Sequence, residues 1–152
     1  MKRIEVKLSL PAVAPLLDVI KDLVSGLKRS LAVTPSLEDL DVEFRNSWTG
    51  DLLDAQRQDL NTLLALFDED FFTEGIVAFD PGNAEAILRS CAAVRLRLRA
   101  RYLDGLGDEA LEAGEVDLNN LADPLRKAFL CYLFLATIQE LIIQHLDTSI
   151  VG

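Results

Sequence analysis

The sequence predicts an all-α protein, a bundle of about four main helices with a small β element at its N-terminus. Apolar residues recur at three- and four-residue spacing over four long stretches, which is typical of amphipathic helices. Residues that favour turns and helix caps separate these stretches. With 152 residues, half of them hydrophobic, the chain is long enough for one domain and short for two. We therefore expect a single helical domain over residues 1–152.

The β element is predicted at Ile4–Leu10, where apolar and polar residues alternate until Pro11 interrupts the pattern. One isolated strand would leave its backbone groups unpaired, so a partner strand is expected. Leu40, Val42 and Phe44 alternate in the same way. They form the candidate partner strand.

The four main helices are predicted at Pro11–Ser30, Gly50–Phe67, Asn83–Leu103 and Pro124–Leu146. Ser47 or Thr49 is the expected cap of the second helix. The fourth helix carries no charge from Ala128 to Gln139 and is predicted to lie at the centre of the fold. Four of its side chains are therefore expected to be largely buried: Leu130, Leu133, Phe134 and Leu135.

The composition excludes several classes of function. A net charge of −10 disfavours binding to nucleic acid or to an anionic membrane. One histidine and two distant cysteines provide no metal cluster or histidine-based triad, so we expect no metal and no cofactor. The apolar stretch after Lys7 is too short for a secretion signal, and Ala128–Gln139 is shorter than the roughly 20 residues of a membrane-spanning helix. We expect an acidic cytoplasmic protein with reduced thiols.

Five arginines in the third predicted helix form the densest charged feature, at positions 89, 95, 97, 99 and 101. Arg95, Arg97 and Arg99 are candidates for an anion clamp, because guanidinium groups bind oxyanions in a forked geometry. In the alternative interpretation their stems pack along the apolar stripe and their charges pair with acids. Glu140 and Asp68–Asp70 are the candidate acids. The acidic balance of the chain favours this structural interpretation.

The remaining candidate residues favour structural roles. Asp68, Glu69, Asp70 and Glu74 do not match the spacing of a calcium loop and indicate a solvated helix end. His145 is expected in the last turn of the fourth helix, where a cation interacts favourably with the helix dipole. Cys91 and Cys131 lie in apolar stretches and are expected to be buried. Trp48 is either a binding anchor or part of a hydrophobic staple at a helix entrance.

Two segments of the chain resemble a known family. They are Asp80–Arg89, continuing through Val94–Arg99, and Phe134–Leu141. Mainly in its C-terminal half, the chain resembles a bacterial family of helical proteins that has no assigned function. In actinobacteria, members of that family are often encoded beside the adaptor of the Clp protease. The resemblance implies an adaptor or regulatory role and brings no active-site residues.

Two classes of function therefore remain. The first is a non-enzymatic helical module that binds a protein partner or self-associates, most simply as a two-fold homodimer. The second is a small-molecule or anion-binding protein, or an enzyme, that uses Arg95, Arg97 and Arg99 with an acid from Asp68–Glu74. Convergence of these arginines on one open pocket would favour the second class.

Overall fold

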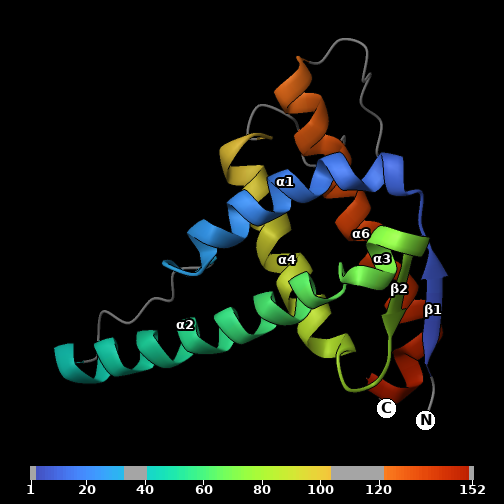
Figure 1. Ribbon diagram of the computed structural model, residues 1–152. Coiled ribbons are helices and arrows are strands. Elements are labelled where there is room, and N and C mark those ends of the chain that lie inside the picture. Colours follow the sequence, from blue (N-terminus) through green and yellow to red (C-terminus); the bar gives the residue numbers. More distant parts are fainter. Residues whose placement is uncertain (1–2, 33–40, 104–121, 151–152) are drawn as a thin grey trace.

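The computed structural model describes residues 3–32, 41–103 and 122–150, and most of these residues are helical (Figure 1). This confirms the predicted, predominantly all-α fold. In chain order the elements are β1 (Ile4–Lys7), α1 (Leu10–Leu27), α2 (Val42–Ala65), α3 (Glu69–Glu74), β2 (Ile76–Phe79), α4 (Ala84–Arg101) and α6 (Asp123–Ile150).

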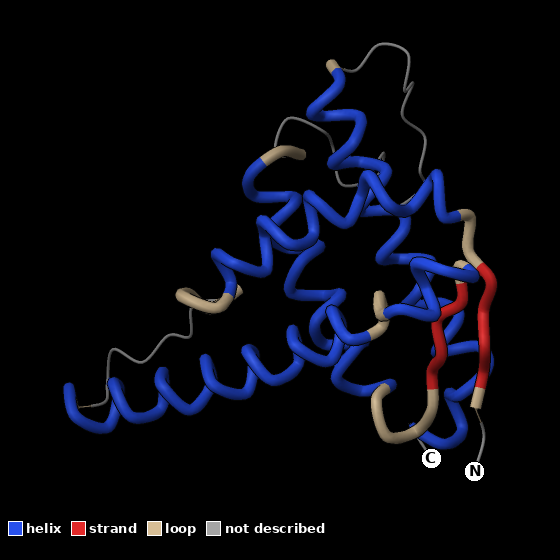
Figure 2. Tube along the Cα trace, in the orientation of Figure 1, coloured by secondary structure: helices blue, strands red, loops and turns tan. Residues whose placement is uncertain are grey.

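Helix α2 begins at Val42, earlier than the predicted start at Gly50. Its cap is Asp41, whose Oδ1 accepts a hydrogen bond from the Phe44 backbone N–H at 2.8 Å, so the caps predicted at Ser47 or Thr49 are wrong. The buried residues of α2 are Leu60 and Leu63, near its C-terminal end. Its N-terminal half extends away from the rest of the described chain (Figures 1 and 2).

The predicted partner of the N-terminal strand is also wrong. Val42 and Phe44 belong to the first turns of α2, and Leu40 lies outside the described residues. Strand β1 instead pairs antiparallel with β2, from Ile4 opposite Phe79 to Lys7 opposite Ile76 (Figure 2). Alternation over five residues is a weak signal, and the capping carboxylate of Asp41 makes that segment helical.

A single glycine connects α3 to β2. Gly75 has φ +75°, the left-handed conformation that favours glycine at the end of a helix. Its N–H donates to the Phe71 carbonyl at 2.8 Å, and its carbonyl accepts from the Leu8 N–H at 2.7 Å. A Cβ at this position would lie 2.6 Å from the Leu8 carbonyl oxygen. The close approach of the two backbones therefore requires glycine.

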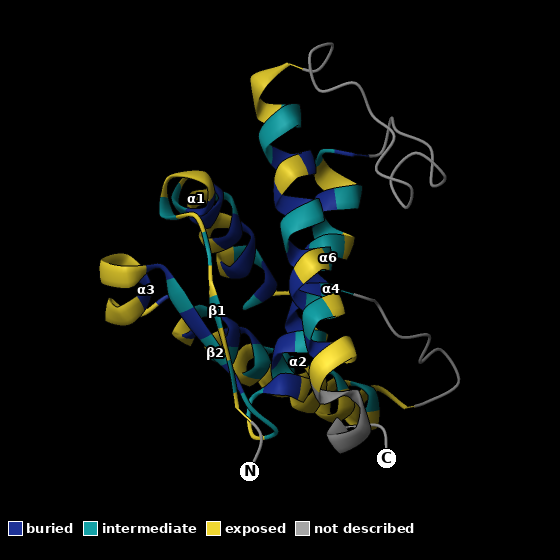
Figure 3. Ribbon diagram, turned by 90° about the vertical axis from the view of Figure 1, so that its right-hand side faces the viewer, coloured by how far each residue is buried: buried dark blue, intermediate teal, exposed yellow. Residues whose placement is uncertain are grey.

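Helix α4 lies at the centre of the fold, because it packs against α1, α2 and α6. Five of its residues are fully buried, namely Ala84, Ile87, Cys91, Val94 and Leu98. The expectation that α6 is the central helix is wrong. Exposed residues follow one side of α6, coloured yellow in Figure 3. Among its four predicted core residues Leu135 is fully buried, Leu133 and Phe134 are half-buried, and Leu130 is 38% exposed.

Among the described helices, α6 is long and apolar enough over Asp123–His145 to cross a membrane by length and composition alone. Core helices of soluble proteins pass the same test. In this fold α6 packs against α4 and α1.

Candidate functional site

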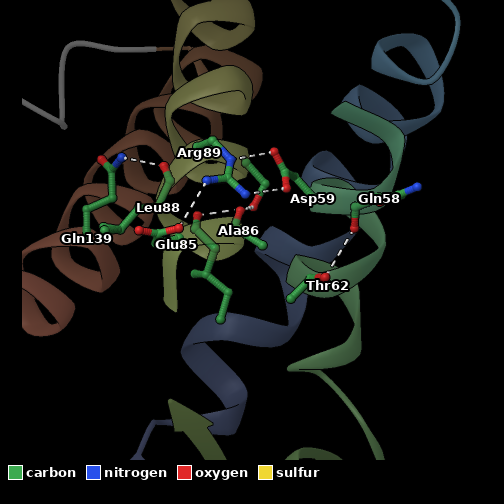
Figure 4. A network of polar contacts seen from close by, with 10 residues as sticks. Gln58, Asp59, Thr62, Glu85, Ala86, Leu88, Arg89 and Gln139 are labelled. Atoms are coloured by element: carbon green, nitrogen blue, oxygen red, sulfur yellow. Dashed lines mark hydrogen bonds and ion pairs between the residues drawn. The ribbon is translucent and has the colours of Figure 1, made fainter. Parts of the chain in front are cut away.

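The arginines of α4 point to different parts of the fold. Arg89 reaches α2, where its Nε lies 2.9 Å from Asp59 Oδ2 and its Nη2 lies 3.0 Å from Asp59 Oδ1 (Figure 4). Glu85, one turn earlier on α4, lies 3.6 Å from Arg89 Nη1. The pKa of the Arg89 guanidinium is raised, mainly because of its hydrogen bonds with Asp59. This forked ion pair links α2 to α4.

Arg95 faces α6. Its Nη1 donates to Gln139 Oε1 at 2.7 Å, and its guanidinium lies 4.4 Å from the ring centroid of the buried Tyr132. Gln139 Nε2 in turn donates to the Leu88 carbonyl of α4 at 3.0 Å (Figure 4). Arg95 therefore takes part in a polar connection between α4 and α6, with a cation–π contact beside it.

Arg97 faces the segment that follows α1. Its Nη2 donates to Ser30 Oγ at 3.1 Å and to the Leu31 carbonyl at 3.3 Å. The guanidinium groups of Arg95 and Arg97 thus make their contacts with different elements. Arg99 is half-buried in the last turn of α4.

The acids that pair with Arg89 and Arg101 differ from the predicted ones. Among the described residues, ion pairs join Arg89 to Asp59 and Glu85, and Arg101 to Asp22 at 3.6 Å. Glu140 is exposed on α6 and accepts a hydrogen bond from Gln144 Nε2 at 3.2 Å. Asp59 was missed because it stands 30 residues from Arg89 in a different helix.

A groove of about 420 Å³ lies between α2 and α4. Its lining is mostly apolar and includes Leu31, Leu52, Ala55, Ala92, Ala93 and Leu96. The ion pair between Asp59 and Arg89 borders it. Gln56 of α2 joins this helix to the end of α1, because its Nε2 donates to the Leu27 carbonyl at 2.6 Å and its Oε1 accepts from the Ala32 N–H at 3.0 Å.

Four large apolar side chains stand exposed along the projecting half of α2, namely Val42 and three others at four-residue spacing. Phe44, Trp48 and Leu52 are 49%, 47% and 37% exposed, and we call them the α2 stripe. The rings of Phe44 and Trp48 lie 6.0 Å apart. Trp48 is inside the helix rather than at its entrance, so the predicted staple position is wrong. The four-residue spacing of the stripe was visible in the sequence, but the helix was predicted to begin after two of its members.

Leu52 belongs both to the α2 stripe and to the groove. The stripe and the groove therefore form one continuous apolar surface, which we call the α2 face. It begins at Phe44 on the projecting half of α2 and ends at the ion pair between Asp59 and Arg89.

A second, polar cavity of about 450 Å³ lies beside the two-stranded sheet and includes Arg3, Glu5, Asp68, Asp70 and Asp80 in its lining. Two of these carboxylates accept backbone hydrogen bonds: Asp68 caps α3, and Asp80 closes the turn before α4. Within the described residues, no group of three His, Cys, Asp or Glu side chains is placed to hold a metal ion.

The other candidate residues have the following surroundings. Cys91 and Cys131 are buried, as predicted, and this burial raises the pKa of each thiol to about 12. His145 is exposed, and α6 continues to Ile150, so the predicted position in the last turn of the helix is wrong.

These features define a predominantly helical protein in which the contacts of Arg89, Arg95 and Arg97 hold neighbouring elements together. A family model described as a domain of unknown function, DUF2017, matches residues 26–146. The chain belongs to this family. No curated protein and no solved structure matches the chain. The family match covers α2 through most of α6 and does not include β1.

Proposed function

We propose that this protein is a non-enzymatic interaction module that binds a protein partner through the α2 face. The observation that carries the proposal is the exposed stripe of Phe44, Trp48 and Leu52, which leads into an apolar groove. Contiguous exposed apolar surface marks interaction sites, and aromatic side chains dominate the binding energy of many interfaces. Single apolar residues scattered over a protein surface are common and would not indicate an interaction site.

The contacts of the arginines support an interaction module over an anion-binding protein. A clamp for one anion needs guanidinium groups that converge. Arg95 donates to Gln139 of α6, whereas Arg97 donates to Ser30 and Leu31 after α1. An adaptor or regulatory role in the cytoplasm also suits the resemblance to a family often encoded beside the Clp protease adaptor.

The test uses two matched phenylalanines. Phe44 lies on the α2 face and Phe72 lies on α3, and their exposed fractions are 49% and 48%. Tagged wild-type protein, Phe44→Ser and Phe72→Ser are used to capture proteins from a cytoplasmic extract of the native cell. Mass spectrometry then quantifies what each variant retains. Far-ultraviolet circular dichroism verifies that both variants are folded.

Proteins that bind the α2 face should be retained by wild-type protein and by Phe72→Ser. Phe44→Ser should lose them about 30-fold, since truncating a central interface aromatic costs about 2 kcal/mol or more. If the two variants capture the same proteins in the same amounts, the α2 face is not the binding site and the proposal is wrong.

A further inference from the structure

The α2 face is bordered by acidic residues. Between Asp41 and Asp59 the chain has five acids and two arginines, a net charge of −3. Asp41 and Asp59 stand at the two ends of the face, on the same side of the helix as the stripe, because they continue its three- and four-residue spacing. Asp51 lies beside the stripe and is exposed, whereas Asp54, two residues after Leu52, lies on the opposite side of the helix from it.

Several of the basic groups near this face are already engaged inside the fold. Arg57 Nε donates to the Lys28 carbonyl at 2.6 Å, and its Nη1 lies 3.2 Å from Asp54 Oδ1. Arg89 makes its forked pair with Asp59. Arg45 lies on one flank of the stripe. These ion pairs also engage two of the acids, Asp54 and Asp59, so the negative potential around the apolar surface comes from the net charge of −3 over residues 41–59, within a chain whose net charge is −10.

The dimensions of the face fit a helix. From Phe44 to Asp59 a helix rises about 22 Å, which is the length of about 15 residues or four turns. An amphipathic helix laid along α2 would cover the stripe with its own apolar residues. Where the stripe meets the groove of about 420 Å³, one of its large side chains would enter between α2 and α4.

We propose that the occupant of the α2 face is a basic amphipathic helix of another protein. Its apolar side covers Phe44, Trp48 and Leu52, and lysines or arginines on its flanks face Asp41 and Asp51. This inference rests on the proposed function and specifies the chemistry of the partner. A second copy of this chain is a poorer occupant, because it would bring the same acidic border and a net charge of −10 to the interface.

The chain provides its own reporter for the test, because Trp48 is its single tryptophan and is 47% exposed. The probe is a synthetic helical peptide of about four turns, with leucine on one face and lysine elsewhere. A second peptide replaces every lysine with glutamate. Trp48 fluorescence is titrated with each peptide, using the full chain. The lysine peptide should shift the emission to shorter wavelength and saturate, and the glutamate peptide should not.

Matched charge variants then separate the face from the overall acidity of the chain. Asp41→Asn with Asp51→Asn should weaken binding of the lysine peptide about tenfold, which is the effect of losing two exposed ion pairs. Asparagine at position 41 retains the helix cap. Asp70→Asn with Glu74→Gln removes the same charge from exposed positions on α3 and should change binding less than about twofold. Phe44→Ser should abolish the emission shift, and Phe72→Ser should retain it.

This inference would be overturned if the glutamate peptide bound as well as the lysine peptide, or if the α3 charge variant weakened binding as much as the α2 charge variant. It would also be overturned if the lysine peptide did not bind. Burial of Trp48 in a homodimer, seen by sedimentation as a species of twice 16.8 kDa, would also overturn it. The proposed function would survive failure of the lysine peptide if Phe44→Ser still lost captured proteins that Phe72→Ser kept.

Discussion

Replacing Arg95 by methionine tests whether the guanidinium at this position stabilises the fold. Arg95→Met keeps an apolar stem of similar length and removes the hydrogen bond to Gln139 and the cation–π contact with Tyr132. If these contacts hold α4 against α6, the variant should unfold more easily than the wild-type protein. If Arg95 belongs to an anion site instead, its removal should leave stability nearly unchanged.

The expected magnitude follows from the two contacts. A hydrogen bond from a charged donor contributes about 1.5–3 kcal/mol, and a cation–π contact contributes about 0.5–2 kcal/mol. Arg95 and Gln139 both line an open cavity of about 380 Å³, so water can reach Gln139 after the substitution and offset part of the loss. We expect a net loss of about 2 kcal/mol. In a domain of this size the melting midpoint should fall about 4–8 °C.

The matched control is Arg101→Met on the same helix. Arg101 pairs with Asp22 at 3.6 Å, and both side chains are more than half exposed, so this variant should lose less than about 1 kcal/mol. Urea unfolding followed by circular dichroism measures both variants. Equal losses would refute the reasoning. The reasoning would also be refuted if Arg95→Met left the melting midpoint unchanged and phosphate raised the midpoint of the wild-type protein alone. Chloride at equal ionic strength is the reference for the phosphate effect.

Three further predictions concern the core, the thiols and Gly75, all measured by urea unfolding. Leu135→Ala should cost about 3 kcal/mol because Leu135 is fully buried, while Leu130→Ala, at 38% exposure, should cost about 1 kcal/mol or less; equal costs would contradict the burial seen on α6. Between pH 9 and 12 the thiols of the unfolded chain lose protons while Cys91 and Cys131 stay protonated in the fold, so stability should fall by up to about 1.4 kcal/mol per pH unit for each thiol. Cys131→Ala should make this decline in stability shallower. An equally steep decline in that variant would contradict a contribution from the buried thiol of Cys131. Gly75→Ala should cost about 1–3 kcal/mol, since the residue has φ +75° and a new Cβ would meet the Leu8 carbonyl oxygen at 2.6 Å; a loss below about 0.5 kcal/mol would show that the two backbones move apart freely.

The fold class and the positions of the helices were predictable from local patterns. The ends of α1 and α4 lie within a few residues of the predicted boundaries. Burial of Cys91 and Cys131 was equally predictable. These features follow from the spacing of apolar residues along one chain segment, which decides which face of a helix leaves water.

Competition between local signals explains the error at the start of α2. Leu40, Val42 and Phe44 alternate like a strand, and Ser47 and Thr49 are good capping residues. Asp41 nevertheless caps the helix, and the helix then continues through Gly50. Placing the helix start too late hid the stripe of exposed apolar residues that became the candidate site.

The sequence by itself determined an acidic, predominantly helical domain with buried thiols and an arginine-rich third helix. Only the tertiary structure decided that β1 pairs with β2, that Arg89 pairs with Asp59, and that the α2 stripe opens into a groove against α4. Each of these features joins residues that are far apart in the chain. Their contacts depend on how the helices pack and cross, and many packing arrangements are compatible with the same local apolar spacing.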